Sequence, residues 1–442
     1  MRQYTSTSMC RYDSTPIRRH ATAGPLTFIP VRSTVVRMTD RYVDCGTLVR
    51  ATGESITDAR IRVEDGRVAD IGTQEAVEAS GERIDHSGET VLPGLIDAHL
   101  HLQGLRSMDP MEWVTDGVAL STARATADLR SLLEAGFTSV RDVGSTTGLG
   151  LREAVDDSDI PGPRIFTSGQ AISQTGGHGD VHSLPHGWVA EGDATISTLA
   201  DGPDECRREA RKRIRDGVDC LKIMTTGGVL SERDAPDQSQ FTDREVSAMV
   251  EEAHRVGIPV ASHAQGTPGI VRALENGVDT IEHGFYLDDD VLDLFLGTDA
   301  TFVPTLAIMH RIVTEGAEHG VPEYGLEKAR EAREAHFDST RRAYETGVPI
   351  ATGTDFLGPE LAPHGTNALE LELLVSEVGM SEAEAIAAAT GVAARTVPAD
   401  DVGHLDVDAR ADFLAVAEDP LSDISVLRDP DAVYRGGELV DL

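Results

Sequence analysis

The sequence predicts an α/β fold in which a (β/α)8 TIM barrel carries a small β-sandwich domain built from both chain ends. Apolar strands and amphipathic helices alternate through the middle of the chain, which is typical of a parallel sheet. Eight such units over roughly 300 residues fit a closed barrel. Short strands with turn residues lie near both ends and predict the sandwich. We expect the barrel in residues 95–395 and the sandwich in residues 39–94 together with 396–442.

Each predicted barrel strand is a short, mainly apolar run bounded by turn or helix signals. The predicted intervening helices include 204–216, 243–256 and 328–346, where apolar residues recur with helical spacing. In such barrels the chemistry lies at the carboxyl ends of the strands, so we expect the site residues there. The eight predicted strands are Leu95–Leu100, Ser139–Val143, Arg164–Ser168, Cys220–Met224, Pro259–His263, Thr280–His283, Phe302–Leu306 and Pro349–Thr352.

Hairpin and strand patterns at the two ends of the chain support a separate β-domain. Residues 59–72 alternate in character and contain Asp65-Gly66, a strong turn signal for a hairpin. Residues 412–417 and 432–440 are again short strands with turn residues. We therefore expect strands from both ends to assemble together.

The first 38 residues differ in composition from the rest of the chain. Residues 1–37 hold six arginines and a single acidic residue, and they are rich in Ser and Thr. Arg18-Arg19 is compatible with a twin-arginine export signal, but prolines and Arg32 interrupt the apolar run that such a signal needs. The composition also allows a transit peptide. A disordered extension, or a start assigned too early with Met38 as the true first residue, is the favoured interpretation.

The charge of the chain restricts its partners. The sequence has 39 basic and 75 acidic residues, for a formal net charge of −36. Such a field repels nucleic acid and anionic membranes, and no apolar run is long enough to span a bilayer. A small-molecule substrate is therefore expected. The acidic composition, with Lys212, Lys222 and Lys328 as its three lysines, resembles that of proteins from salt-loving organisms.

The cysteines favour a cytoplasmic protein. The chain has four, Cys10, Cys45, Cys206 and Cys220, and none lies in a CxxC motif. This pattern fits a reduced compartment better than a disulfide framework.

Two histidines end the first predicted barrel strand. His99 and His101 are separated by one residue, so on a strand they share a face and can converge on one ion. The motif alone is weak, since two polar residues at a strand end would look the same.

Lys222 lies inside an apolar predicted strand, Cys220–Met224. Burying an ammonium is costly unless it is neutralised or paired. Carboxylation by carbon dioxide would give an anionic oxygen ligand that can bridge two ions. A structural ion pair with a neighbouring carboxylate explains Lys222 about equally well when it is taken alone.

Three more candidates end the later strands. His263 and His283 end the fifth and sixth predicted strands, and Asp355 follows the eighth. A lone histidine at a strand end is usually a structural hydrogen-bonding group. The ordered set of four imidazoles, one lysine and one carboxylate at the same strand ends predicts a centre for Zn²⁺ or a similar ion.

The sequence resembles the binuclear amidohydrolase superfamily, in particular the imidazolonepropionase-like branch that includes Xaa-Pro dipeptidases and N-acyl amino-acid hydrolases. The resemblance runs from about residue 43 to the C-terminus, with the motifs in family order. It is carried by Val91–His101, Gly136–Gly144, Thr175–Asp180, Leu221–Val229, Ser262–Ala264, Ile281–Gly284, Thr352–Asp355 and the alanine-rich stretch 388–394.

The resemblance implies two divalent metal ions, with zinc the expected metal, although the same ligand types also suit Mn, Fe or Co. It also implies that carbon dioxide carboxylates Lys222. Related enzymes often form homo-oligomers, which the sequence neither requires nor excludes. The implied ligands are His99, His101 and Asp355 for the more buried ion, His263 and His283 for the second, and carboxylated Lys222 as the bridge.

The implied reaction is hydrolysis of an amide C–N bond in an N-acyl amino acid or an Xaa-Pro-type dipeptide. A hydroxide shared by the two ions would be the nucleophile, and the second ion would polarise the carbonyl. Asp355 would move the proton to the leaving amine. The implied catalytic residues are Asp355, Lys222 and His283.

Three residues are predicted to bind substrate. His178 matches a substrate-contacting histidine of the branch, although Gly176-Gly177-His178-Gly179 is also a turn sequence. His364 is predicted to line the entrance. Gln265 stands where several dipeptidase-like relatives have a tyrosine that contacts the substrate carbonyl, which puts dipeptidase activity itself in question. Weaker candidates are His182 and His186, while His254, His310, His319, His336 and His404 are expected on solvated helices or loops.

Three other functions compete with this hypothesis. The same metal site would also serve hydrolysis of a cyclic amide, a lactone or a phosphoester, because substrate choice depends on loop conformation. A mononuclear deaminase is less favoured, since no acid follows His263 closely and Lys222 is present. A non-catalytic barrel would be expected to have lost metal ligands, but all six are present.

Overall fold

Parallel strands and helices alternate through the middle of the chain, so the fold is α/β, as predicted. The computed structural model describes residues 40–190 and 195–441. The predictions for residues 1–38, including the export signal and the alternative start at Met38, lie outside these residues. Within the described residues, no helix has the length and apolar character needed to cross a membrane.

The parallel strands form two sheets. Strands β5 (Leu95–Leu100), β6 (Phe137–Asp142) and β7 (Arg164–Thr167) make a three-stranded sheet in that order. The second sheet has six strands in the order β13-β12-β11-β10-β8-β9. Its strands are β8 (Ala171–Ser173), β9 (Ser197–Leu199), β10 (Leu221–Met224), β11 (Val260–Ala264), β12 (Thr280–His283) and β13 (Thr301–Val303).

The first six predicted strands match β5, β6, β7, β10, β11 and β12 to within a few residues, whereas the last two differ. The predicted strand Phe302–Leu306 is wrong at its end, because β13 stops at Val303 and Leu306 begins helix α9 (Leu306–Glu315). Thr305 has a left-handed backbone (φ 57°), which ends the extended conformation. The region predicted as Pro349–Thr352 is not a full strand. It makes a single parallel bridge, from Ile350 to Phe302.

The helices begin and end at recognisable sequence signals. Helix α6 (Asp243–Arg255) starts with a capping box formed by Thr242 and Glu245, and α10 (Glu323–Thr346) ends at Gly347, which has a φ of 89°. The other helices are α1 (Pro110–Thr115), α2 (Val118–Glu134), α3 (Gly148–Asp156), α4 (His186–Ala190), α5 (Pro203–Asp216), α7 (Thr267–Glu275), α8 (Asp289–Leu296), α11 (Leu369–Leu373) and α12 (Glu382–Ala387), with π-helical turns at Leu374–Val378 and Ala388–Val392 and a 3-10 turn at Ile424–Arg428.

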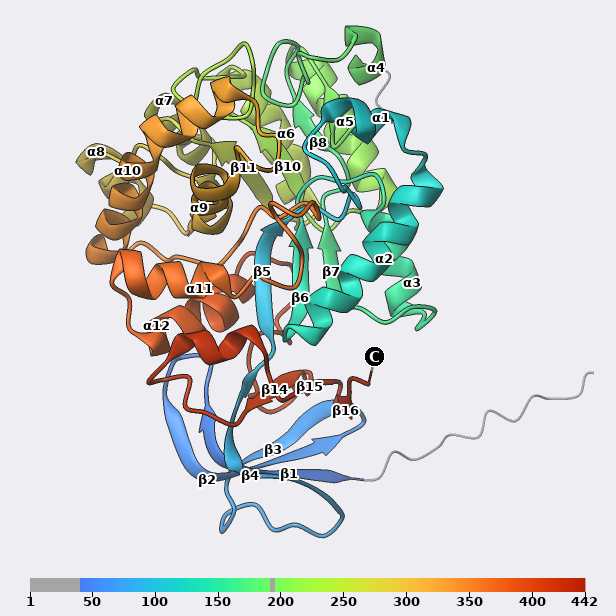
Figure 1. Cartoon of the computed structure of the whole chain (residues 1–442), viewed down its shortest axis with the longest axis vertical. Helices are drawn as coiled ribbons and strands as arrows, with labels where there is room; N and C mark the ends of the chain where they lie inside the picture. Colours follow the sequence, from blue (N-terminus) through green and yellow to red (C-terminus); the bar gives the residue numbers. More distant parts are fainter. Residues whose placement is uncertain (1–39, 191–194, 442) are drawn as a thin grey trace, which may run out of the picture. The chain divides into compact units, whose positions relative to one another are not determined.

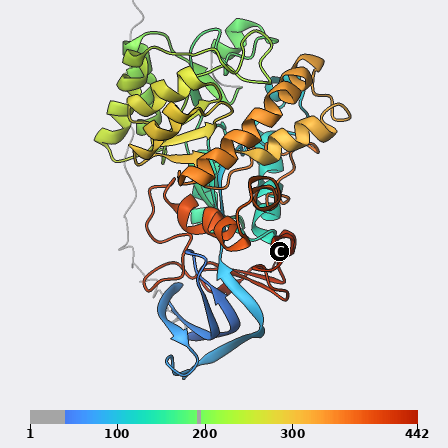
Figure 2. The same ribbon diagram turned by 90° about the vertical axis from the view of Figure 1, so that its left-hand side faces the viewer.

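Strands from the two ends of the chain share one seven-stranded sheet, in the order β16-β15-β14-β4-β1-β2-β3. The views in Figures 1 and 2 both place the late strands beside the early ones. The predicted hairpin is present, and its turn residues Asp65 and Gly66 both have positive φ, at 50° and 77°. The strands are β1 (Arg41–Val49), β2 (Ser55–Glu64), β3 (Arg67–Thr73), β4 (Glu82–Pro93), β14 (Phe413–Val416), β15 (Ala432–Arg435) and β16 (Glu438–Leu439).

Candidate active site

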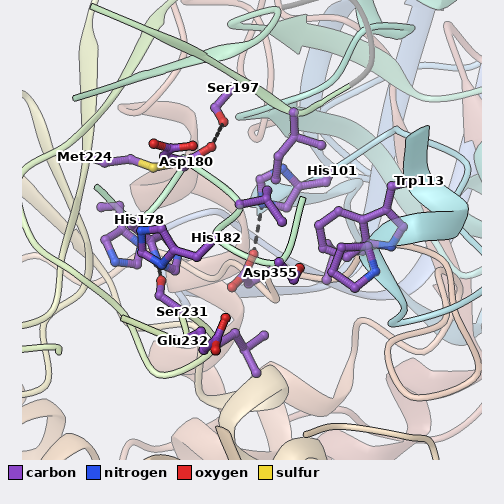
Figure 3. Close-up of a pocket in the computed structure, with 18 of the residues that line it drawn as sticks. His101, Trp113, His178, Asp180, His182, Ser197, Met224, Ser231, Glu232 and Asp355 are labelled. Atoms are coloured by element: carbon purple, nitrogen blue, oxygen red, sulfur yellow. Dashed lines mark hydrogen bonds and ion pairs between the residues drawn. The ribbon is translucent and has the colours of Figure 1, made fainter. Parts of the chain in front are cut away.

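The carboxyl ends of the parallel strands bring all six predicted metal ligands to one cavity. Its volume is about 140 Å³. In Figure 3, Asp355 lies near the middle of this cavity, with Trp113 on one side and His178 on the other. Five of the six are buried and Asp355 is partly exposed. The six residues are His99, His101, Lys222, His263, His283 and Asp355.

Asp355 is the centre of the closest group. Its Oδ1 lies 3.0 Å from His101 Nε2 and 3.4 Å from His99 Nε2. One ligand atom from each of His99, His283 and Asp355 lies within 4.8 Å of the others, a spacing that can hold a cation. His263 extends the group, since its ring centroid is 4.6 Å from that of His283.

Each of the four imidazoles has its second nitrogen engaged by another group. His99 Nδ1 donates to Glu282 (2.6 Å), His101 Nδ1 to the Gly144 carbonyl (2.9 Å) and His263 Nε2 to the Gly227 carbonyl (3.1 Å). His283 Nδ1 lies 2.8 Å from Thr305 Oγ1. The three contacts to carbonyl or carboxylate oxygens fix the tautomer of His99, His101 and His263, and all four contacts leave the other ring nitrogen available as a ligand. That nitrogen is Nε2 in three of the rings and Nδ1 in His263.

Glu282 contacts the predicted ligand His99. Sequence reasoning did not identify Glu282 as part of the site. Its carboxylate contacts His99 on one side and the fully buried Arg141 guanidinium (2.9 Å) on the other. Burial raises the pKa of Glu282, but Arg141 and His99 outweigh it and hold the pKa at about 2. Glu282 is therefore an anion at neutral pH. The sequence shows Arg141 and Glu282 as isolated charges inside apolar strands, which signals that each needs a partner but does not say which one.

Lys222 is the least satisfied charged group of the site. Its side chain is buried, and its Nζ has no hydrogen-bond partner among the described residues. Burial lowers the pKa of Lys222 to about 8, although Glu282 and Asp355 act in the opposite direction. A buried amine of lowered pKa is neutral far more readily than an exposed lysine. This is the form that reacts with carbon dioxide, so the residues present fit the expected two-metal group.

Unusual backbone conformations cluster at the same place. His283, Thr305 and Asp355 have φ values of 75°, 57° and 57°, a region that non-glycine residues rarely adopt. Backbone strain of this kind is commonly found at functional sites, where surrounding contacts maintain it.

His178, on a loop, lies against the cluster of predicted metal ligands. Its ring stacks on His263 with centroids 4.1 Å apart, and its Nδ1 contacts Ser231 Oγ (Figure 3). Its backbone N–H donates to Gln240 Oε1 (3.0 Å). Gly228 must be glycine here, because a Cβ would lie 2.3 Å from the His178 ring.

Helix α10 holds the loop that contacts His178. Lys328 Nζ donates to the carbonyls of Ser231 and Asp234, at 2.6 Å each. The Asp234 carboxylate in turn accepts from Gly228 N (3.1 Å) and Gln240 Nε2 (3.0 Å). A continuous set of hydrogen bonds therefore runs from α10 to the His178 ring and backbone.

Neither of the other two predicted substrate-binding residues, Gln265 and His364, lines the main cavity. Gln265 lines a second, smaller cavity of about 40 Å³ that shares His178, His263, His283 and Asp355 with the first. His364 is not among the residues lining either cavity. It is buried, and its Nε2 donates to the His101 carbonyl (3.2 Å), so it contacts the backbone of a predicted ligand rather than the entrance.

The remaining histidines separate into three groups. His182 lines the main cavity, whereas His186 is exposed at the start of α4. The expectation of a solvated position is wrong for His336, which is fully buried: its Nε2 donates to the Pro304 carbonyl (2.7 Å) and its ring packs on Phe285. Burial lowers the pKa of His336 to about 3. Partly or fully exposed positions are found for His254, His310, His319 and His404.

The walls of the main cavity are largely apolar, and sequence reasoning did not identify them. They come from helix α1, the loop after β10 and helices α9 and α10, which are far apart in the sequence. The apolar wall residues include Pro110, Trp113, Leu230, Ile308, Tyr324 and Leu357.

Imidazoles and a carboxylate that converge at the strand ends of an α/β fold are the ligand types found in metal-dependent hydrolases. The model of the amidohydrolase family matches residues 90–440, and the chain belongs to that family. It is therefore an enzyme that hydrolyses carbon–nitrogen bonds.

Individual relatives agree with this assignment. The chain is 33% identical over 435 residues to ochratoxinase from Aspergillus niger. This match covers 92% of this chain and 89% of that protein. The crystal structure of that ochratoxinase has a TM-score of 0.83 at 32% identity, covering 90% of this chain and 95% of the other. The crystal structure of a Xaa-Pro dipeptidase with bound methionine has a TM-score of 0.81 at 32% identity. The match covers 91% of this chain and 100% of that one.

Proposed function

We propose that this enzyme hydrolyses the amide C–N bond of an N-acyl amino acid or an Xaa-Pro-type dipeptide, using two divalent metal ions. The observation that carries the proposal is one cavity lined by the four predicted histidine ligands, Asp355 and a buried lysine amine that has no hydrogen-bond partner among the described residues. The activities named for three similar proteins agree in chemistry. One is an ochratoxinase, one a Xaa-Pro dipeptidase, and one a prolidase in complex with N-methylphosphonate-L-proline.

The proposed ligand sets follow from position and chemistry. Carboxylation of Lys222 would replace its unpartnered amine by an anion between the two ions, and zinc is the proposed metal. Neutral imidazole and carboxylate are the protonation states that metal binding requires. One ion would be held by His99, His101 and Asp355, and the other by His263 and His283, with carboxylated Lys222 shared.

Each side chain of the site has a distinct role in the proposed hydrolysis. When bound, the ions lower the pKa of a water molecule and polarise the scissile carbonyl. Asp355 takes the proton of the attacking water and delivers it to the leaving nitrogen, a role that its position beside His99 and His101 allows. His178 donates to a substrate oxygen from the opposite wall. Glu282 keeps the His99 ring in place.

We also propose the finer fold that the sequence predicts. Bridges from Leu100 to Phe356 and from Phe302 to Ile350 link the two parallel sheets, which supports a closed (β/α)8 barrel in residues 95–395. The terminal sheet would be the core of the β-sandwich domain formed by 39–94 and 396–442. A cytoplasmic, salt-adapted enzyme is consistent with the charge of −36.

The proposal is tested by a substrate screen with metal-loaded enzyme at high salt. N-acyl amino acids and dipeptides, including Xaa-Pro, are compared with lactones, cyclic amides and phosphoesters. We expect turnover in the first group. Turnover confined to lactones or phosphoesters would overturn the amide assignment while leaving the metal site intact.

A further inference from the structure

The N-terminus of helix α9 lacks the capping contact that its N-cap residue would normally supply. That residue is Thr305, and a threonine hydroxyl at this position ordinarily accepts a hydrogen bond from a backbone N–H of the first turn. Here the hydroxyl makes no such bond and lies 2.8 Å from His283 Nδ1 instead. The backbone of Thr305 is left-handed, with a φ of 57°, whereas N-cap residues are usually extended. Thr305 therefore contacts a predicted metal ligand and leaves its own helix uncapped.

Glu370, on helix α11, supplies the acceptors that Thr305 does not. Its Oε1 accepts a hydrogen bond from Leu306 N (3.0 Å), and its Oε2 accepts one from Ala307 N (2.7 Å). The first N–H groups of a helix have no partner within the helix, so a carboxyl group at this place satisfies them. The two helices lie next to each other in Figure 1. Helix α9 is thus capped by a side chain from another helix.

The position of Glu370 is unfavourable for a carboxyl group. Its side chain is fully buried, and within residues 40–190 and 195–441 no cationic side chain forms an ion pair with it. Burial raises the pKa of Glu370 to about 8, although the N–H groups of Leu306 and Ala307 act in the opposite direction. A buried carboxyl group without a counter-ion is costly, and groups with strongly shifted pKa values are concentrated at functional sites.

We propose that Glu370 is a positioning residue, which caps α9 in place of Thr305 and so leaves the Thr305 hydroxyl free to orient the His283 ring. This inference rests on the proposed function, in which His283 holds the second ion. Without Glu370, the uncapped N–H groups of α9 compete with His283 for the Thr305 hydroxyl. The backbone of Thr305 then relaxes toward the extended conformation of an ordinary N-cap residue, and His283 loses its contact at Nδ1.

The first test compares Glu370→Leu, which removes both acceptors, with Glu370→Gln, which keeps one. Titration of the metal-free enzyme with Zn²⁺ against a competing chelator gives the affinity for each ion. We expect Glu370→Leu to weaken binding of the second ion by roughly 10-fold or more, the size of effect found for groups that orient a ligand, and to change the first ion little. Glu370→Gln should lie between Glu370→Leu and the wild type.

Glu372→Gln is the matched control. Glu372 lies on the same helix, but its carboxylate pairs with Arg428 and not with α9, so neither affinity should change. An effect of Glu372→Gln as large as that of Glu370→Leu would overturn the proposal.

A double-mutant cycle shows whether Glu370 acts through Thr305 or only stabilises the helix. Thr305→Val removes the hydroxyl and keeps the shape of the side chain, whereas Thr305→Ser keeps a hydroxyl and should retain the affinity. If Glu370 acts through Thr305, the double variant Glu370→Leu/Thr305→Val binds the second ion as Thr305→Val does, within about twofold. Losses that multiply would overturn the proposal. Glu370→Gln replaces Glu370→Leu in the cycle should the latter fold poorly.

Crystal structures of the metal-free variants separate this inference from the proposed function. In Glu370→Leu we expect Thr305 to have a negative φ and its hydroxyl to lie beyond hydrogen-bond distance of His283 Nδ1. That result supports the positioning role even if no amide is hydrolysed or only one ion binds. A contact between Thr305 and His283 that is unchanged in both Glu370 variants would overturn it.

Discussion

The strand-end floor of the main cavity and its wall at the loop 228–234 are built differently, and each depends on one of the three lysines of the chain. On the floor, the imidazoles come from strand ends, and Lys222 Nζ has no hydrogen-bond partner within residues 40–190 and 195–441. In the wall, the loop 228–234 is held by Lys328, whose Nζ donates to two carbonyls. Under the proposed function, the unsatisfied amine lies where hydrolysis would occur, whereas the satisfied one supports a loop that would contact the substrate.

Among the substitutions, the largest effect should come from Lys222→Met. The substitution removes the proposed bridging ligand, so we expect activity to fall by about a thousandfold or more. Metal analysis should show fewer than the two ions per chain expected for the wild type. Lys212→Met is the matched control, since Lys212 is largely exposed and pairs with Glu209 on α5. Full activity in the Lys222 variant would remove the bridging role.

Removal of metal tests the floor as a whole. Dialysis against a chelator should abolish hydrolysis, and added Zn²⁺, Mn²⁺ or Co²⁺ should restore it, because the ions supply the activated water. The measurement is the recovered rate against bound metal. If the hydrolysis rate recovered completely when one ion per chain was bound, a mononuclear site would be favoured instead.

Glu282→Gln should have the next largest effect. Loss of the carboxylate leaves Arg141 buried without its counter-ion and weakens the contact that orients His99. We expect destabilisation of about 3–5 kcal/mol in chemical unfolding and a roughly 10- to 100-fold loss of metal affinity. Glu372→Gln removes the carboxylate of a more exposed pair, with Arg428, and should change both quantities little.

Lys328→Met addresses the wall and should have the smallest effect. Without its two hydrogen bonds the loop loosens, so Ser231 positions His178 less well. We expect KM to rise by roughly 3- to 10-fold with bound metal unchanged. If bound metal also fell by a similar factor, the loop 228–234 and the predicted metal ligands would not act independently.

Sequence reasoning predicted the floor well and the wall poorly, for physical reasons. A residue at the end of a parallel strand has a fixed direction, so His99, His263 and His283 could be placed from local patterns alone. Trp113 and Leu230 lie in loops or short helices whose conformation depends on distant contacts. Thr305 was misassigned because its positive φ leaves no clear local sequence signal.

Some support of the floor was also beyond local patterns. Glu282 and Arg141 become partners only when two strands meet, and the sequence shows two isolated charges. His336 was expected at the surface because its helix is mostly polar, yet tertiary packing buries that face against Phe285.

The scarcity of lysine has a practical consequence for spectroscopy. Lys212 and Lys328 both donate to oxygen acceptors as ammonium groups, which do not capture carbon dioxide. A sample equilibrated with carbon-13 bicarbonate would therefore give one carbamate resonance among the described lysines, assigned to Lys222 by its loss in Lys222→Met, because the N-terminal amine also forms a carbamate. A change in the position of this resonance on addition of metal would report metal binding at Lys222. No engineered label would be needed.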